Sequence, residues 1–146
     1  MIYDDVGRHF GEAGGFDEAA LPLGVYLAWC ANHGLLSEEL EGRAGHLVTR
    51  VRYREVGGCE LAVAGCGGIL ADEHLNADGR AFTSSHYDQF LDTFRELCHD
   101  QPTGDEWAVY DRLAPELTRA LMRFRGHRRE QPSVPAGRWW RRWWRR

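Results

Sequence analysis

The chain of 146 residues contains no lysine, so all eighteen of its basic residues are arginine. It also lacks any apolar run of the roughly 18 residues that a membrane-spanning helix needs. Its opening stretch, MIYDDVGRHF, carries acids where a secretory signal would have a hydrophobic core. The four cysteines form no C-x-x-C pair and no disulfide-dense spacing, which favours reduced, mostly buried thiols. We therefore expect a cytoplasmic protein.

Signatures of the common enzyme classes are missing as well. The sequence has no G-x-S-x-G elbow, no G-x-x-x-x-G-K phosphate loop, no H-E-x-x-H helix and no G-x-G-x-x-G fingerprint. The HLNADG segment matches a calcium loop at Asn76, Asp78 and Gly79, but the two end ligands would be His74 and Ser85, which excludes that site. We expect a non-enzymatic protein with no cofactor and no bound metal.

Periodicity and composition indicate a mainly α fold, a compact single-domain helical bundle with an ordered N-terminal loop. Hydrophobic and charged fractions of 43% and 27% are ordinary for a folded protein. Apolar spacing and capping residues predict helices over residues 17–33, 37–53, 80–99 and from 105 onwards, with a new helix at Pro115. The segment VGGCELAVAGCGGIL fits either a buried strand or a short helix, and we favour a short helix ended by Gly67 and Gly68. A single turn capped by Asp72 completes the pattern.

Charge divides the chain into an acidic body and a basic end. Residues 1–121 hold nine arginines against twenty-one acids, about −12, whereas residues 123–146 hold nine arginines against Glu130 alone, about +8. We assign an acidic helical domain to 1–125, a linker rich in proline and glycine to 126–137, and a tail to 138–146. The acidic body argues against specific nucleic-acid binding and favours a basic protein partner.

The tail, RWWRRWWRR, is an amphipathic segment. On a helix its tryptophans fall within an arc of roughly 140° and its arginines occupy the opposite arc. This arrangement suits an anionic membrane surface, where indoles bury and guanidinium groups contact phosphate. Alternatively, the tail docks on the acidic body or on a partner protein, or the nine residues are an engineered addition to the chain. The surface-docking candidates are Arg138, Trp139, Trp140, Arg141, Arg142, Trp143, Trp144, Arg145 and Arg146.

Three clusters contain groups able to act as acids, bases or metal ligands. They are Tyr3, Asp4, Asp5 and His9; Asp72, Glu73, His74 and Asn76; and His86, Tyr87 and Asp88. If the fold gathered Asp4, Asp5, His9, Asp72 and His74 in one open pocket, a metal-dependent hydrolase would result. The alternative is that these side chains bond the backbone and hold the fold together. No local spacing requires the metal site.

The chain resembles an uncharacterised family of small bacterial proteins, a domain of unknown function. The resemblance rests on YDDVGRHF, on VYLAWCANHGLLSEEL, and on DEHLNADGRAF followed by YDQFLDTF, with matched residues Tyr3, Asp4, Asp5, His9, Ala28, Trp29, Asn32, Gly34, Leu35, Asp72, Glu73, Leu75, Asn76, Gly79, Phe82 and Tyr87. His33, between Asn32 and Gly34, departs from the family pattern. The resemblance implies a small helical cytoplasmic domain, similar to the acidic proteins that accompany bacterial toxins.

These observations lead to one principal hypothesis. We expect a protein-binding module, of the immunity type by that resemblance, whose acidic body engages a basic protein while the tail docks on an anionic surface at the inner membrane face. Its structural or binding motif comprises Tyr3, Asp4, Asp5, His9, Trp29, Asp72, Glu73 and Asn76. The metal-dependent hydrolase and a peripheral membrane adaptor are the alternatives, and the sequence leaves the oligomeric state open.

Overall fold

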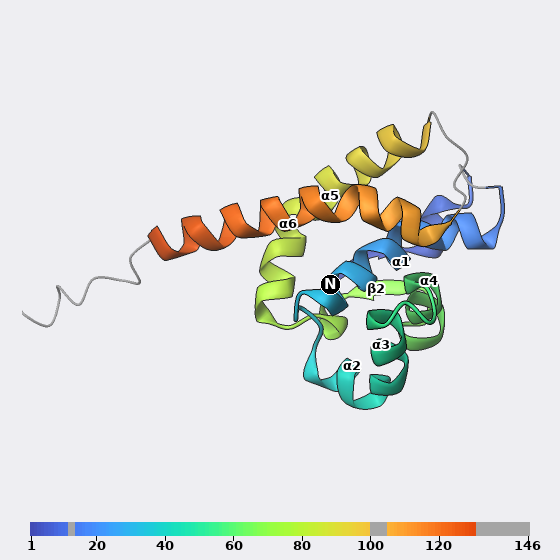
Figure 1. Ribbon diagram of the computed structural model, residues 1–146, viewed down its shortest axis with the longest axis horizontal. Helices are drawn as coiled ribbons and strands as arrows, with labels where there is room; N and C mark the ends of the chain where they lie inside the picture. The colour runs from blue at the N-terminus through green and yellow to red at the C-terminus, as the bar shows by residue number, and fades with distance from the viewer. Residues whose placement is uncertain (12–13, 100–104, 131–146) are drawn as a thin grey trace, which may run out of the picture.

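The computed structural model describes residues 1–11, 14–99 and 105–130. The fold is mainly helical and compact, with one small two-stranded sheet, as the sequence predicted (Figure 1). The elements in chain order are β1 (Ile2–Asp5), η1 (Val6–His9), α1 (Phe16–Asn32), α2 (Glu38–Arg43), α3 (Gly45–Arg52), α4 (Gly58–Glu60), η2 (Leu61–Gly65), β2 (Ile69–Ala71), η3 (Asp72–His74), α5 (Ala77–His99) and α6 (Glu106–Glu130).

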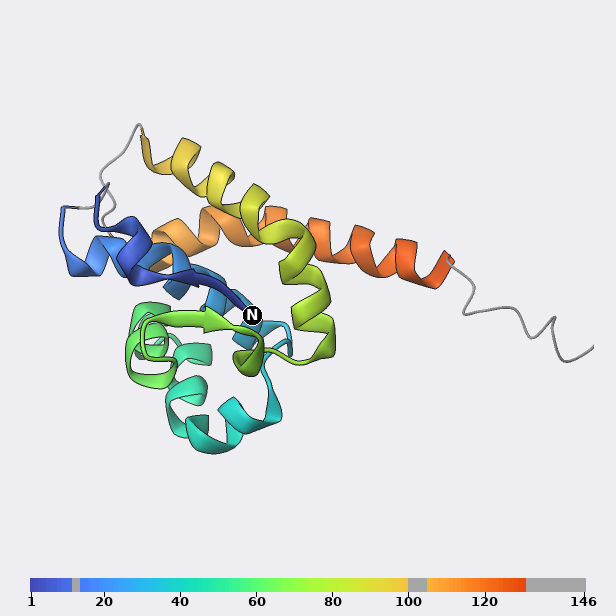
Figure 2. The same ribbon diagram turned by 180° about the vertical axis from the view of Figure 1, so that it is seen from behind.

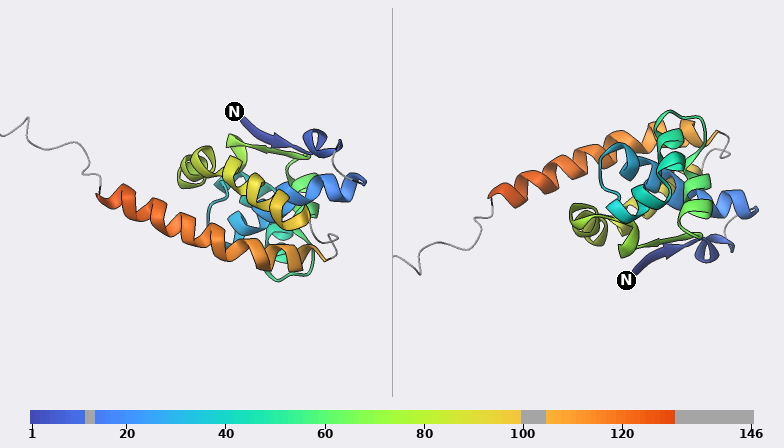
Figure 3. Two further views of the ribbon diagram at one scale, coloured as in Figure 1. Left: turned by 90° about the horizontal axis from the view of Figure 1, so that it is seen from above. Right: turned by 90° about the horizontal axis from the view of Figure 1, so that it is seen from below.

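Helix α1 lies at the centre of the molecule, and every residue from Ala19 to Ala31 is buried. The sheet lies on one side of α1 and α6 on the other (Figure 3). The predicted helix over 17–33 is confirmed, and Gly34 follows it with a left-handed φ of 66°. The backbone of α4 packs directly against α1, since a Cβ at Gly24 would lie 2.5 Å from the backbone nitrogen of Cys59.

The helix predicted over 37–53 is divided into α2 and α3. Its start is confirmed, because the Ser37 hydroxyl accepts a hydrogen bond from the backbone N–H of Leu40 at 3.1 Å. The chain leaves the helical region at Ala44, whose φ is −121°. The segment GRAG at this point contains two glycines, which are poor helix formers, so a bend costs little there. Helix α3 ends before Arg54, which takes a positive φ of 58°.

The opening segment, which we expected to be an ordered loop, in part forms strand β1. It pairs antiparallel with β2, with Ile2 opposite Ala71 and Asp5 opposite Ile69. Neither strand shows the polar and apolar alternation of a half-buried strand, and some 65 residues separate them, so the sequence carried no local signal for this pair. The short helix ended by glycines is confirmed by α4 and η2, and Gly67 and Gly68 both have positive φ.

Helices α5 and α6 cross each other above α1 (Figures 1 and 2). The prediction of a helix over 80–99 is confirmed by α5. The prediction of a new helix at Pro115 is wrong, because Pro115 lies inside the continuous helix α6. Leu113, Leu117 and Leu121 are buried on the inner face of α6, and their packing outweighs the backbone hydrogen bond that proline cannot make.

Helix α6 also runs to Glu130, five residues into the range assigned to the linker. Its C-terminal end projects from the body (Figures 1 and 3). The nine tail residues 138–146 lie outside the described residues.

All four thiols are free, and Cys30 and Cys66 are buried, in agreement with the sequence. Burial raises the pKa of Cys66 to about 12. Among the helices of residues 1–11, 14–99 and 105–130, none is both long enough and apolar enough to cross a bilayer.

Candidate functional site

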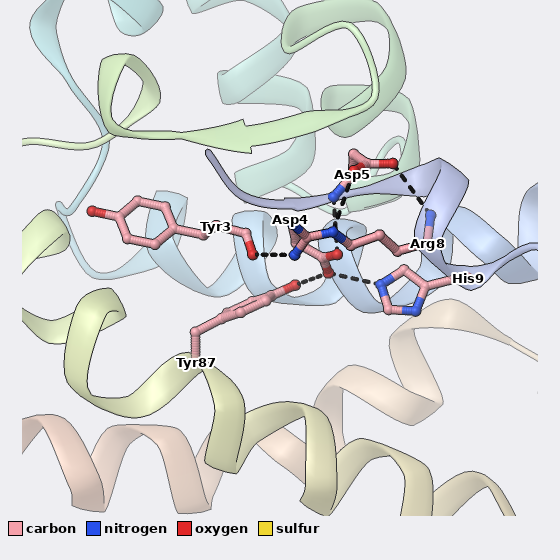
Figure 4. A network of polar contacts seen from close by, with 6 residues as sticks. All are labelled: Tyr3, Asp4, Asp5, Arg8, His9 and Tyr87. Carbon is pink, nitrogen blue, oxygen red and sulfur yellow. Dashed lines mark hydrogen bonds and ion pairs between the residues drawn. The ribbon is translucent and has the colours of Figure 1, made fainter. Parts of the chain in front are cut away.

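The carboxylate of Asp4, on strand β1, is the centre of a buried polar network, with a residue exposure of 1%. Its Oδ1 accepts from the backbone N–H of Asp5 at 2.9 Å. Its Oδ2 accepts from His9 Nε2 at 2.7 Å and from the hydroxyl of Tyr87 at 2.6 Å (Figure 4). These donors replace the water that the carboxylate loses on burial. Asp4 therefore joins β1, η1 and α5.

Tyr87 brings α5 into this network. Its side chain is buried, and both burial and the neighbouring Asp4 raise its pKa well above the ordinary value. The phenol thus keeps its proton and acts as a donor. Its ring meets Tyr26 of α1 edge-on with centroids 4.9 Å apart, and the Tyr26 hydroxyl bonds the Thr83 hydroxyl at 2.8 Å. The network is therefore anchored in the aromatic core.

Asp5 has a different and purely local role. Its carboxylate caps η1 by accepting from the backbone N–H of Arg8 at 3.2 Å and lies 3.5 Å from the Arg8 guanidinium. Arg8 in turn donates to the backbone oxygen of Tyr3 at 3.2 Å (Figure 4). Adjacent acids in the sequence thus serve two sites: Asp4 faces the core and Asp5 closes the turn.

The hydroxyl of Tyr3 donates to the carboxylate of Asp72 at the start of η3. This hydrogen bond is the main cause that lowers the pKa of Asp72, while burial and then Asp72 raise the pKa of Tyr3. The hydroxyl of Ser84 on α5 lies 3.4 Å from the Tyr3 oxygen. Tyr3 therefore ties the N-terminal strand to two later segments.

The second polar cluster also holds the backbone in place. His74 is buried, and its Nδ1 accepts from the backbone N–H of Ala71 at 3.2 Å, closing η3. Burial lowers its pKa, which agrees with an unprotonated Nδ1. Asn76 accepts from the backbone N–H of Gly79 at 2.8 Å, at the start of α5, and donates to the backbone oxygen of Gly34 at 2.7 Å. Glu73 is exposed.

Trp29 lies apart from both clusters, in the centre of the core with no exposure. Its indole Nε1 donates to the hydroxyl of Thr118 on α6 at 3.2 Å, and its ring stacks on His33 with centroids 4.7 Å apart. His33 contacts the same Thr118 hydroxyl through Nε2 at 3.1 Å. Trp29 and His33 therefore fasten α6 to α1.

The structure thus brings Asp4 together with His9, and Tyr3 with Asp72, but it does not gather the five residues of the hydrolase hypothesis in one open pocket. Over the three described ranges, no group of three or more histidines, cysteines and acids is placed to hold a metal ion. Within the same ranges, every buried side-chain nitrogen and oxygen has a hydrogen-bond partner. The geometry gives the hydrolase alternative no support.

Sequence reasoning named Tyr87 as a candidate in the third polar cluster but left it out of the predicted motif, and it did not name Thr118 at all. Tyr87 belongs to the apolar stripe of α5, and Thr118 lies on the mainly charged second half of α6. A hydroxyl on a helix face predicted to be buried needs a partner, and this signal could have added Tyr87 to the motif. The charged surroundings of Thr118 carry no such signal.

The projecting end of α6 is strongly basic. Five arginines follow Thr118 in the helix, against Glu130 as the acid of this stretch; they are Arg119, Arg123, Arg125, Arg128 and Arg129. All five are exposed. Arg128 pairs with Asp78 at 3.0 Å, and within the described residues the other four make no ion pair. A basic surface is therefore present within helix α6 itself.

Comparison with known proteins gives one result. The model of a family described as a domain of unknown function (DUF7832) matches residues 2–106. The matched range contains both polar clusters and Trp29, and it ends at the first residue of α6. No curated protein and no solved structure matches the chain.

Proposed function

The chain belongs to the DUF7832 family of domains of unknown function, and we propose that it is a non-enzymatic binding module of the immunity type. Its acidic body engages a basic protein, and its basic C-terminal end docks on an anionic surface. The observation that carries the proposal is that charge is segregated on the surface while the polar groups of the interior bond one another or the backbone.

The interior supports binding over catalysis. A catalytic acid or base has to reach a substrate in a pocket. Asp4 and His74 are 1% and 3% exposed. The Asp4 carboxylate bonds the backbone and buried side chains, and His74 Nδ1 bonds the backbone while its Nε2 lies 3.6 Å from Glu73. Asp5 and Asn76 cap the starts of η1 and α5. These groups stabilise the fold that presents the surface.

The acidic side of the surface is best defined at the start of α2. Glu38 and Glu39 are exposed in its first turn, and within the described residues neither makes an ion pair. The Ser37 hydroxyl donates to the backbone oxygen of Glu73, which brings the exposed Glu73 beside them. We call Glu38, Glu39 and Glu73 the acidic patch. A basic partner would meet the unpaired carboxylates of Glu38 and Glu39 there, beside Glu73, whose own carboxylate lies 3.6 Å from a buried imidazole nitrogen. The net charge of the body would steer that partner.

A charge-reversal experiment tests the acidic patch. The intact protein and a Glu38→Arg/Glu39→Arg variant are used as baits in the source cell, and the basic proteins retained by each are compared. The matched control is Asp88→Arg/Glu96→Arg, the same charge change at exposed positions of α5. We expect the patch variant to lose a basic protein that the control retains.

With that partner purified, its association rate should fall as salt is raised, because ionic screening weakens steering. Equal loss in both variants would show that net charge alone matters and would remove the patch from the proposal. Retention of no basic protein by the intact chain, or an association rate that salt does not change, would contradict the proposal itself.

The anionic surface is the second half of the proposal. Five arginines on the end of α6 and five in the tail give this end its positive charge, and each arginine near an anionic membrane contributes about 1 kcal/mol. Exposed Met122, at 69%, adds an apolar side chain to the helix end. We propose the cytoplasmic face of the inner membrane as that surface.

A further inference from the structure

Helices α5 and α6 leave a hollow between them with a volume of about 240 Å³. Its floor is apolar: Phe90 of α5 meets Leu113, Leu117 and Ala120 of α6. Among the candidate polar residues of the sequence analysis, His86 lines the hollow, whereas the acidic patch does not contribute to it. Six of its ten lining residues belong to α6, which lies almost entirely beyond the range of the family match.

Two arginines stand on one rim of the hollow. Arg119 and Arg123 are one helical turn apart on α6, so their side chains leave the same face about 5 to 6 Å apart. Both are exposed, and within the described residues neither has an ion-pair partner. Across from them, α5 presents the side-chain amide of Gln89, whereas the imidazole of His86 already donates from Nδ1 to the backbone oxygen of Phe82 at 3.2 Å. The rim therefore offers several donors to an anion.

Glu116 is the acidic residue among those that line the hollow, and it lies one turn before Arg119 on α6, toward the other end of the hollow. The positive charge is thus concentrated at the Arg123 end and the apolar floor extends away from it. A ligand that matches this arrangement has an anionic head and an apolar body, in that order along α6.

Size selects the class of ligand. From His86 to Thr93 the α5 wall spans seven residues, about 10 Å at 1.5 Å a residue. Pockets for drug-sized ligands hold about 300 to 1,000 Å³, so this one fits a smaller molecule. A stable protein interface buries about 800 Å² of surface on each partner, which is more surface than the walls of a hollow of this volume can supply. The dimensions favour a small molecule over a helix of a partner.

We propose that the hollow between α5 and α6 binds a small amphipathic anion, a carboxylate with a short alkyl or single-aromatic body. The head lies between Arg119 and Arg123, and the body lies over Phe90 and Leu117. This inference does not depend on the basic partner or on residues 138–146, although Arg119 and Arg123 also belong to the basic end of α6.

The test is a titration of the full-length protein with sodium decanoate below its micelle concentration, followed by amide NMR, with neutral decanol as the matched probe. We expect shifts at Phe90, Leu117 and Ala120, and tighter binding of decanoate than of decanol. Arg119→Gln/Arg123→Gln should weaken decanoate binding about fivefold to tenfold and leave decanol unchanged, since two charge-assisted contacts are lost.

Two further variants complete the design. Arg125→Gln/Arg129→Gln makes the same charge change at exposed positions outside the lining, and it should alter decanoate binding by less than about twofold. Glu116→Gln should tighten decanoate binding, a gain that an unfolded variant could not show. Equal affinity for the two probes, equal loss in the control, or shifts confined to other regions would each overturn the proposal.

Discussion

A double-mutant cycle on Asp4 and Tyr87 tests whether the buried polar network holds the N-terminal strand. Tyr87→Phe removes one hydrogen bond to a carboxylate and keeps the ring, which packs 4.9 Å from Tyr26 and 5.6 Å from Phe90. A hydrogen bond to a charged group contributes about 1.5 to 3 kcal/mol. We expect Tyr87→Phe to lower the free energy of unfolding by that amount.

Asp4→Ala is more disruptive because it removes the acceptor of three donors at once. The Tyr87 hydroxyl and His9 Nε2 are left in a buried position, each at a cost of about 1 to 3 kcal/mol. In the double variant the Tyr87 hydroxyl is absent, so its share of this cost disappears. The two effects should therefore fall short of additivity by roughly 1.5 to 3 kcal/mol.

The assay is urea unfolding of the four proteins, read by far-ultraviolet circular dichroism, with the denaturant slopes compared to confirm a common unfolding transition. Asp5→Ala serves as the control, because Asp5 only caps η1 and its loss should cost about 0.5 to 2 kcal/mol without coupling to Tyr87. Additivity of Asp4→Ala and Tyr87→Phe within about 0.5 kcal/mol would refute the network. A stoichiometric metal that is present in the natural protein and lost in Asp4→Ala would refute the structural role.

Three further predictions concern other parts of the molecule. Burial lowers the pKa of His74 below its ordinary 6.5. The neutral imidazole therefore contributes stability above pH 6.5 that is lost as the pH falls from 6.5 through the folded-state pKa. In His74→Asn, the free energy of unfolding should depend less on pH over this range. Gly24→Ala should destabilise by about 1 to 3 kcal/mol, because its Cβ would overlap the backbone of α4, whereas Gly42→Ala, with open space, should be neutral or stabilising in thermal unfolding. The full chain should co-sediment with anionic vesicles more than with zwitterionic ones, and truncation after Gly137 should reduce this difference without lowering the melting temperature; equal sedimentation of both chains would exclude the tail as the docking segment.

Local patterns predicted the parts of the fold whose signal lies within one helix or turn. The apolar face of α5, the cap at Ser37 and the paired glycines after η2 were all readable because the interacting residues lie within a few positions of one another. The β1 and β2 pair was missed because its partners are distant and each strand is short. The error at Pro115 has the same origin: proline is a local stop signal, and tertiary packing of α6 overrides it.

The candidate site divides in the same way. The polar motif residues could be identified because they lie in poor helix-forming segments. The sequence could not predict which of the two adjacent acids, Asp4 or Asp5, would be buried. The register of the β1 and β2 pair shifts between Ile2 and Asp4. Of the two adjacent acids, Asp4 is the buried one, and it accepts a hydrogen bond from Tyr87 on α5. That choice depends on three segments arriving together, which no spacing along β1 encodes.

The length of α6 also bears on how one protein can carry an acidic body and still approach an anionic surface. Leu121 is the last buried residue of the helix, and nine residues separate it from Glu130, a distance of about 13 Å at 1.5 Å a residue. Electrostatic interactions at physiological salt are screened over about 8 Å. The start of α5 lies nearer this end, but its Asp78 is neutralised by Arg128 at 3.0 Å. With α6 directed toward the surface, repulsion between the surface and the acids farther back in the body is largely screened, while the arginines of the helix end are close enough to act. Because Thr118 bonds Trp29 and His33 within the core, the helix is fixed in the body. The two charges can therefore serve two different partners.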